Sequence, residues 1–168
     1  MKTLSVRVET AAGASLRSDA PDVFIRPPRL FLFGLILGGG LGWLWPAAVW
    51  PLGLRLTLSG FLIVLGVIIM AIGYRQFRAV GTYVKTIEPT LVLVTNGLFR
   101  FSRNPFYISL ILIYLGIGVV INNLWIFALL VPLLVVLHYG VILREERYLE
   151  GKFGADYLNY KATVRRWL

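Results

Sequence analysis

Two groups of polar residues stand out in a sequence that is otherwise strongly apolar. The first lies between residues 95 and 107 and offers a turn, a guanidinium, an amide and a phenol, from Asn96-Gly97, Arg103, Asn104 and Tyr107. The second is Arg144-Glu145-Glu146, directly after the last apolar run. Carboxylates attract an ammonium or sulfonium group, and arginine binds a carboxylate through paired hydrogen bonds. If the two groups meet, their mixture suits a zwitterionic ligand.

The same residues also have a purely structural interpretation. Arg103 can extend its charged end to the membrane surface, and Asn104-Pro105 can simply begin a helix. The two glutamates can lie in water at a helix end. Because neighbouring residues of a helix point about 100° apart, we expect only one of Glu145 and Glu146 to face a ligand.

The elements that would position these groups are four apolar runs, at residues 30–49, 56–72, 106–121 and 124–143. The chain is 58% hydrophobic and 15% charged, far from the balance of a soluble domain. The runs contain 20, 17, 16 and 20 residues, against about 20 needed to cross a bilayer. We predict an all-α, polytopic membrane protein with about four transmembrane helices, or three and a re-entrant segment. Only Asn122-Asn123 separates the last two runs, which predicts a tight hairpin that brings the two polar groups together.

The distribution of charge predicts the orientation of the chain. With four crossings, sixteen of the seventeen Lys and Arg residues fall on one side, and only Arg55 falls on the other. Positive charge collects in cytoplasmic loops, so both termini are predicted to be cytoplasmic, in the cell inner membrane. Four of the five tryptophans gather at the opposite interface, namely Trp43, Trp45, Trp50 and Trp125. We divide the chain into a cytoplasmic tail, residues 1–29, and one membrane domain, residues 30–168.

Composition also excludes several classes of protein. The net charge of +9 comes from cations that flank apolar helices, so their partner is expected to be the bilayer surface and not a nucleic acid. The chain has no cysteine and a single histidine. We therefore expect no metal site, no disulfide and no cysteine nucleophile. The sequence assigns no oligomeric state.

Two local patterns predict how the elements pack. Gly34, Gly38 and Gly42 recur at four-residue spacing, which favours close helix packing. The long connection from Tyr74 to Pro105 has an apolar stretch before Asn96-Gly97, and we expect it to fold back onto the membrane domain.

The end of the chain is polar but rich in aromatic rings, which include Tyr148, Tyr157, Tyr160 and Trp167. We expect Gly151 and Gly154 to interrupt the chain before a short C-terminal interfacial helix. The alternative is a basic amphipathic helix that only lies on the lipid headgroups.

Four motifs in the same order resemble a known family. They are residues 93–97, 102–107, 144–149 and 152–160. Together they resemble the isoprenylcysteine carboxyl methyltransferases and are more distantly similar to the phospholipid N-methyltransferases. The resemblance covers about residues 85–165, and residues 85–166 would form the cofactor-binding part.

The resemblance implies a methyltransferase that uses S-adenosyl-L-methionine, a lipophilic or lipid acceptor, and a lateral opening for that acceptor. Cofactor-binding residues follow from it and from the polar groups: Leu91, Val92, Leu93, Val94, Gly97, Phe99, Arg103, Asn104, Pro105, Tyr107, Glu145 and Glu146. Arg103 and Glu145 are also the predicted catalytic residues. His138, about two turns before Glu145, is the candidate base for an amine acceptor and has packing as its alternative role.

Departures from the family pattern leave the acceptor open. Asn104 and Leu91 replace histidines of the eukaryotic prenylcysteine enzymes, Phe99 replaces a tyrosine, and Val141 falls about where an arginine binds the substrate carboxylate. We slightly favour a carboxyl O-methyltransferase, with a phospholipid amine N-methyltransferase as the alternative. A non-enzymatic packing partner is the third possibility, based on the glycine-spaced first helix.

Overall fold

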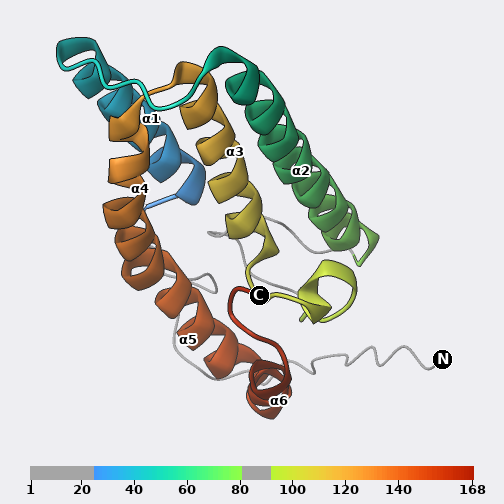
Figure 1. Cartoon of the computed structure of the whole chain (residues 1–168). Coiled ribbons are helices and arrows are strands. Elements are labelled where there is room, and N and C mark those ends of the chain that lie inside the picture. Colours follow the sequence, from blue (N-terminus) through green and yellow to red (C-terminus); the bar gives the residue numbers. More distant parts are fainter. Residues whose placement is uncertain (1–24, 81–91) are drawn as a thin grey trace.

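A computed structural model of the chain describes residues 25–80 and 92–168, and these residues form helices without strands (Figure 1). The α-helices are α1 (Pro27–Leu44), α2 (Leu52–Ala79), α3 (Pro105–Ile121), α4 (Leu124–Leu137), α5 (Leu143–Phe153) and α6 (Ala155–Thr163). A 3-10 turn, Gly97–Arg100, precedes α3, and a π-helical turn, His138–Ile142, joins α4 to α5.

Three helices are long and apolar enough to cross a membrane, and a shorter apolar helix accompanies them. The three are α1, α2 and the continuous helix Leu124–Phe153 formed by α4 and α5. The shorter one is α3, whose 17 residues extend for about 26 Å against roughly 30 Å of hydrocarbon. The prediction of an all-α, polytopic membrane protein is confirmed.

Prolines move the helix ends away from the ends of the apolar runs. Helix α1 begins with Pro27 in its first turn, so three residues assigned to the tail belong to the helix. It ends at Leu44 rather than Val49, because Pro46 disfavours a helical conformation at Trp45. Helix α2 follows the extended Pro51.

The last two membrane helices are joined closely but do not pack closely along their length. Helix α3 packs mainly against α2, and α4 packs mainly against α1. Figure 1 shows α3 and α4 separating from their two-residue link toward α5. The expected hairpin therefore exists at its turn only, and it opens toward the polar end of the molecule.

Helices α3 and α4 thus form a wedge, and Asn122 and Asn123 hold its closed end together. Asn122 has a left-handed backbone with φ 58°, and its Oδ1 accepts hydrogen bonds from the amides of Val49 and Trp50 at 2.9 and 2.8 Å. Asn123 caps α4 and donates from Nδ2 to the carbonyl of Gly38 at 2.8 Å. Both side chains thus satisfy backbone groups of other segments, which matters where water is scarce.

The glycine spacing in α1 does produce close helix packing. A Cβ added to Gly34 would meet Leu133, and one added to Gly42 would meet Asn123. At Gly38 it would lie 3.0 Å from the Cα of Ile126, so the α4 backbone itself blocks a side chain. The stripe is therefore the surface on which α4 packs.

Only one of the two C-terminal glycines interrupts a helix. Gly154 has φ 51° and separates α5 from α6, whereas Gly151 lies inside α5. The expectation that both would break the chain is wrong for Gly151, because a single glycine costs a helix only about 1 kcal/mol and the flanking residues favour it.

Replacing Gly38 by alanine tests the close approach of α1 and α4. We expect Gly38→Ala to destabilise the protein by about 1–3 kcal/mol, because the backbone of Ile126 cannot move aside without shifting α4. Thermal unfolding in detergent measures the effect. Gly40→Ala is the control, because nothing lies within 4 Å of its added Cβ. Equal melting temperatures for the two variants would contradict the packing described.

Candidate functional site

A cavity of about 230 Å³ lies at the open end of the wedge between α3 and α5. This volume is slightly below the roughly 300–1,000 Å³ of most small-molecule sites. The walls come from the start of α1, the end of α2, residues 92–94, the start of α3, α5 and α6. They are largely apolar, with a few charged and phenolic groups. A mainly apolar hollow with a few convergent polar groups is typical of a ligand site.

One polar wall of the cavity joins the first turn of α3 to α5. The hydroxyl of Tyr107 donates a hydrogen bond to Oε2 of Glu145 at 2.5 Å, and both residues line the cavity. The two predicted polar groups therefore meet. Glu145 supplies a carboxylate in contact with the cavity.

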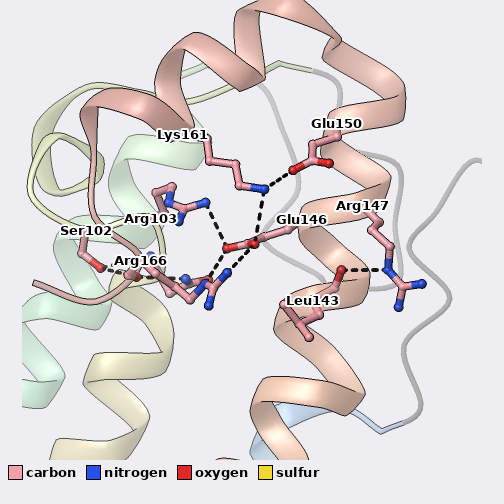
Figure 2. A network of polar contacts seen from close by, with 9 residues as sticks. Ser102, Arg103, Leu143, Glu146, Arg147, Glu150, Lys161 and Arg166 are labelled. Carbon is pink, nitrogen blue, oxygen red and sulfur yellow. Dashed lines mark hydrogen bonds and ion pairs between the residues drawn. The ribbon is translucent and has the colours of Figure 1, made fainter.

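The other polar wall is an ion-pair network centred on Glu146 (Figure 2). The Glu146 side chain is only 7% exposed, and it lies 3.0 Å from Nη1 of Arg103. Arg166 binds it with two hydrogen bonds, Nε to Oε1 at 2.8 Å and Nη2 to Oε2 at 2.9 Å. Lys161 lies 4.0 Å from Oε2 and also pairs with Glu150.

Both glutamates line the cavity, and the expectation that only one of them faces a ligand stays a prediction. The two side chains do point in different directions, because one binds Tyr107 and the other binds Arg103 and Arg166. The reason is that protein surrounds α5 at this level. Helix α3 lies on one side of it, and the last residues of the chain lie on the other.

The segment of residues 164–168, which we name the C-terminal strap, binds the entrance of α3 beside the cavity without lining it. Its backbone pairs with the entrance of α3: the amide of Arg103 donates to the carbonyl of Arg165 at 3.0 Å. The carbonyl of Arg166 accepts from Ser102 Oγ at 3.3 Å and from Asn104 Nδ2 at 3.0 Å. Asn104 therefore holds the strap as well as lining the cavity.

Aromatic rings form much of the remaining wall. Phe77, Phe99 and Phe106 pack with ring centroids 5.3–6.1 Å apart, within the range of favourable aromatic contacts. Tyr160 of α6 donates its hydroxyl to the carbonyl of Phe99 at 2.8 Å. Helix α6 is thus bound to the 3-10 turn, with Tyr157 and Tyr160 buried in the contact.

Burial raises the pKa of both phenols further above neutral pH. Loss of solvent raises the pKa of Tyr157, with a further increase from the negative charge of Glu146 and an opposing effect of Arg103. The pKa of Tyr160 is raised for the same first reason. Both hydroxyls therefore remain hydrogen-bond donors under physiological conditions.

Ten of the twelve predicted cofactor-binding residues line this cavity: Val92, Leu93, Val94, Phe99, Arg103, Asn104, Pro105, Tyr107, Glu145 and Glu146. Gly97 does not line it. With φ 62° it makes a turn beside Gln76, where a side chain would collide. Leu91 lies outside the described residues. For residues 92–104, the expectation that the long connection folds back onto the membrane domain is confirmed.

His138, the predicted base, lies apart from this cavity. It lines a second cavity with Tyr139, Trp167 and the aliphatic residues Ile111, Val131, Leu134 and Val135. That cavity lies between α3 and α4, and its volume is about 410 Å³. The surroundings of His138 are therefore more apolar than those of Glu145.

Several cavity residues were missed in the sequence. Met70 and Phe77 come from the polar end of α2, a helix that the sequence presents as structural. Tyr157 and Tyr160 carried a signal, namely two rings three residues apart in a polar segment that would not need them in water. Pro27 and Pro28 carried none.

The described residues define a class of protein: a helical membrane protein with a cavity of about 230 Å³ whose polar walls carry both signs of charge. They contain no group of three or more potential metal ligands. Residues 54–156, more than half of the chain, match the model of the phospholipid methyltransferase family. The chain belongs to the phospholipid methyltransferase family, which indicates a membrane methyltransferase.

A protein of Haemophilus influenzae described as uncharacterized is 42% identical to this chain over 62 residues. That match covers 37% of this chain and 98% of the other. No solved structure matches the chain. The phospholipid methyltransferase part of the resemblance is thus confirmed, and the isoprenylcysteine part stays a prediction.

Replacing the buried Glu146 carboxylate tests how much the ion-pair network contributes to the free energy of unfolding. We expect Glu146→Gln to destabilise the protein by about 3 kcal/mol, because it leaves the buried Arg103 and the bound Arg166 without their shared anion. Chemical unfolding in detergent, followed by circular dichroism, measures it. Glu150→Gln is the control, since that side chain is 31% exposed and a pair so exposed contributes less than about 1 kcal/mol. Similar losses in both variants would show that Glu146 is not the centre of the network.

Proposed function

We propose that this protein is an S-adenosyl-L-methionine-dependent methyltransferase that modifies a lipophilic acceptor within the membrane. The observation that carries the proposal is the cavity between α3 and α5, where Glu145, Arg103 and aromatic rings surround one space. Membership of the phospholipid methyltransferase family supports the reaction type. The cofactor and the acceptor are the parts that we propose.

The chemistry of the cavity suits this cofactor. S-adenosyl-L-methionine carries an ammonium, a sulfonium, a carboxylate and an adenine ring. Glu145 offers a negative charge for the cationic groups, Arg103 offers a positive charge for the carboxylate, and Phe99 and Phe106 offer ring surfaces for a flat base. The bound cofactor would supply a methyl group already activated by the sulfonium. The protein then has to position the two reactants and exclude water, for which a largely apolar cavity is suited.

The proposed orientation lets a soluble cofactor reach this cavity. The cavity lies at the end of α3 and α5 where the positive charges are concentrated, whereas Arg55 lies at the other end of α2. With the charged end in the cytoplasm of a cell with an inner membrane, the cofactor enters from the cytoplasm and the lipid from the bilayer.

Calorimetric titration of the purified protein tests cofactor binding. We expect S-adenosyl-L-methionine to bind, and Glu145→Gln to weaken binding by about 1–3 kcal/mol, the scale of a charge-assisted contact. Glu150→Gln is the matched control, because Glu150 lies on the same helix without lining the cavity. Absence of binding to the wild-type protein at millimolar cofactor would contradict the proposal. Binding and cellular methylation that both survive Glu145→Gln would favour a role in packing.

For the acceptor, we now place a phospholipid amine before an isoprenylcysteine carboxylate. The family match favours it. Val141, which falls about where the resemblance implies a carboxylate-binding arginine, is fully buried in the π-helical turn.

An amine acceptor must lose a proton, and this gives His138 a testable role. For an amine we expect His138→Gln to lower methyl transfer by about 10²–10⁴-fold, the usual contribution of a general base, with unchanged cofactor binding. Tyr139→Phe is the control, because Tyr139 lines the same cavity. Labelled methyl transfer into extracted lipids, read by mass spectrometry, identifies the product and the rate together. A methyl ester as product, or full activity of His138→Gln with an amine, would remove His138 as the base.

A further inference from the structure

Arg103 is a buried cation that lines the cavity, and its partner Glu146 is also bound by Arg166. Its side chain is 9% exposed, so about nine-tenths of it is buried, and it lines the cavity. Nη1 lies 3.0 Å from Glu146 Oε1. Yet among the described residues neither Nη1 nor Nε makes a hydrogen bond. A buried guanidinium with unused donors costs free energy unless a ligand completes it.

The reason for these unused donors is the geometry of Arg166. Its Nε and Nη2 bind the two oxygens of Glu146 in the planar, two-point arrangement that suits a carboxylate. Arg103 therefore contacts a carboxylate on which Arg166 already holds the two-point hydrogen-bonding position. Figure 2 shows Arg103 approaching Glu146 from the segment before α3 and Arg166 approaching it from the strap, with Lys161 nearby.

The charges of the network do not balance. Three cations, Arg103, Lys161 and Arg166, contact two carboxylates, Glu146 and Glu150. Glu145, the next residue along α5, accepts a hydrogen bond from Tyr107. Within the five described residues of the network one positive charge is in excess, and Arg103 is the cation of the three that lines the cavity. An anionic group of a ligand at Arg103 would balance it.

We propose that Arg103 receives the carboxylate of a zwitterionic ligand, and that Arg166 is the positioning residue that keeps Arg103 available by occupying Glu146. The proposal rests on the proposed function, because it takes that ligand to be S-adenosyl-L-methionine. It places the carboxylate at Arg103 and leaves Glu145 for the cationic groups. Arg166 lies beyond the family-matched residues 54–156, so the family match assigns it no role.

The test compares two ligands that differ in one group: S-adenosyl-L-methionine and its decarboxylated analogue, which keeps the sulfonium, the amine and the adenosine. Each is titrated calorimetrically into the purified full chain in detergent. We expect the wild-type protein to prefer the complete cofactor by about 10–100-fold, as for one charge-assisted hydrogen-bonded contact. Arg103→Gln and Arg166→Gln should each reduce this preference to a few-fold while the analogue binds about as well as before.

Arg165→Gln is the matched control, because Arg165 is exposed and contributes only its backbone carbonyl to the contact with Arg103. We expect it to keep the wild-type preference. If Arg166→Gln does not fold, the double variant Glu146→Gln/Arg166→Gln replaces it, since it leaves no buried carboxylate unmatched. Because no carboxylate is then left to hold Arg103, we expect the double variant to keep the wild-type preference, and a loss of preference there contradicts the positioning role.

The outcomes separate the two proposals. If the wild-type protein binds neither ligand, the proposed function itself fails. If it binds both with equal affinity, the cofactor assignment stands and the role of Arg103 is overturned. If Arg166→Gln weakens both ligands equally and keeps their ratio, or if the double variant loses the preference, the positioning role of Arg166 is overturned.

Discussion

The structure depends on one buried carboxylate, that of Glu146. It joins three segments that are distant in sequence: α5, the entrance of α3 through Arg103, and the C-terminal strap through Arg166. A carboxylate this deeply buried is stable only with opposite charges and hydrogen bonds close by. Each segment is therefore needed for the others to keep their places. Two members of this junction, Arg103 and Glu146, line the cavity.

The separation of α3 from α4 leaves room for the cavity. Asparagines hold α3 and α4 together at one end, and the glycines of α1 draw α4 away from α3 along its length. The wedge that results opens where α5 leaves the apolar region. Without α1, two helices joined by two residues would be expected to pack along their whole length, and no cavity would remain between them.

The sequence predicts the composition of the site better than its geometry. Residue types were enough to identify Arg103, Tyr107, Glu145 and Glu146, because charges beside apolar helices are few. The helix count and the glycine packing also followed from composition and spacing. The roles of the two glutamates did not, because the π-helical turn His138–Ile142 changes the direction of every later residue. One extra residue in a turn rotates the rest of the helix by about 100°. The residue types at positions 138–142 do not predict a π-helical turn.

The strap could not be foreseen for a different reason. Its position depends on backbone hydrogen bonds to residues 102–104, and backbone groups are the same in every sequence. Arg166 resembles its neighbour Arg165 in type, yet the first is bound to Glu146 and the second is exposed. Only the register of the strap distinguishes them. That register places a basic segment, which could have lain on the lipid headgroups, against Glu146 beside the cavity. If Arg103 receives the carboxylate of a zwitterionic ligand as proposed, the contact of Arg166 with Glu146 determines which way round that ligand binds.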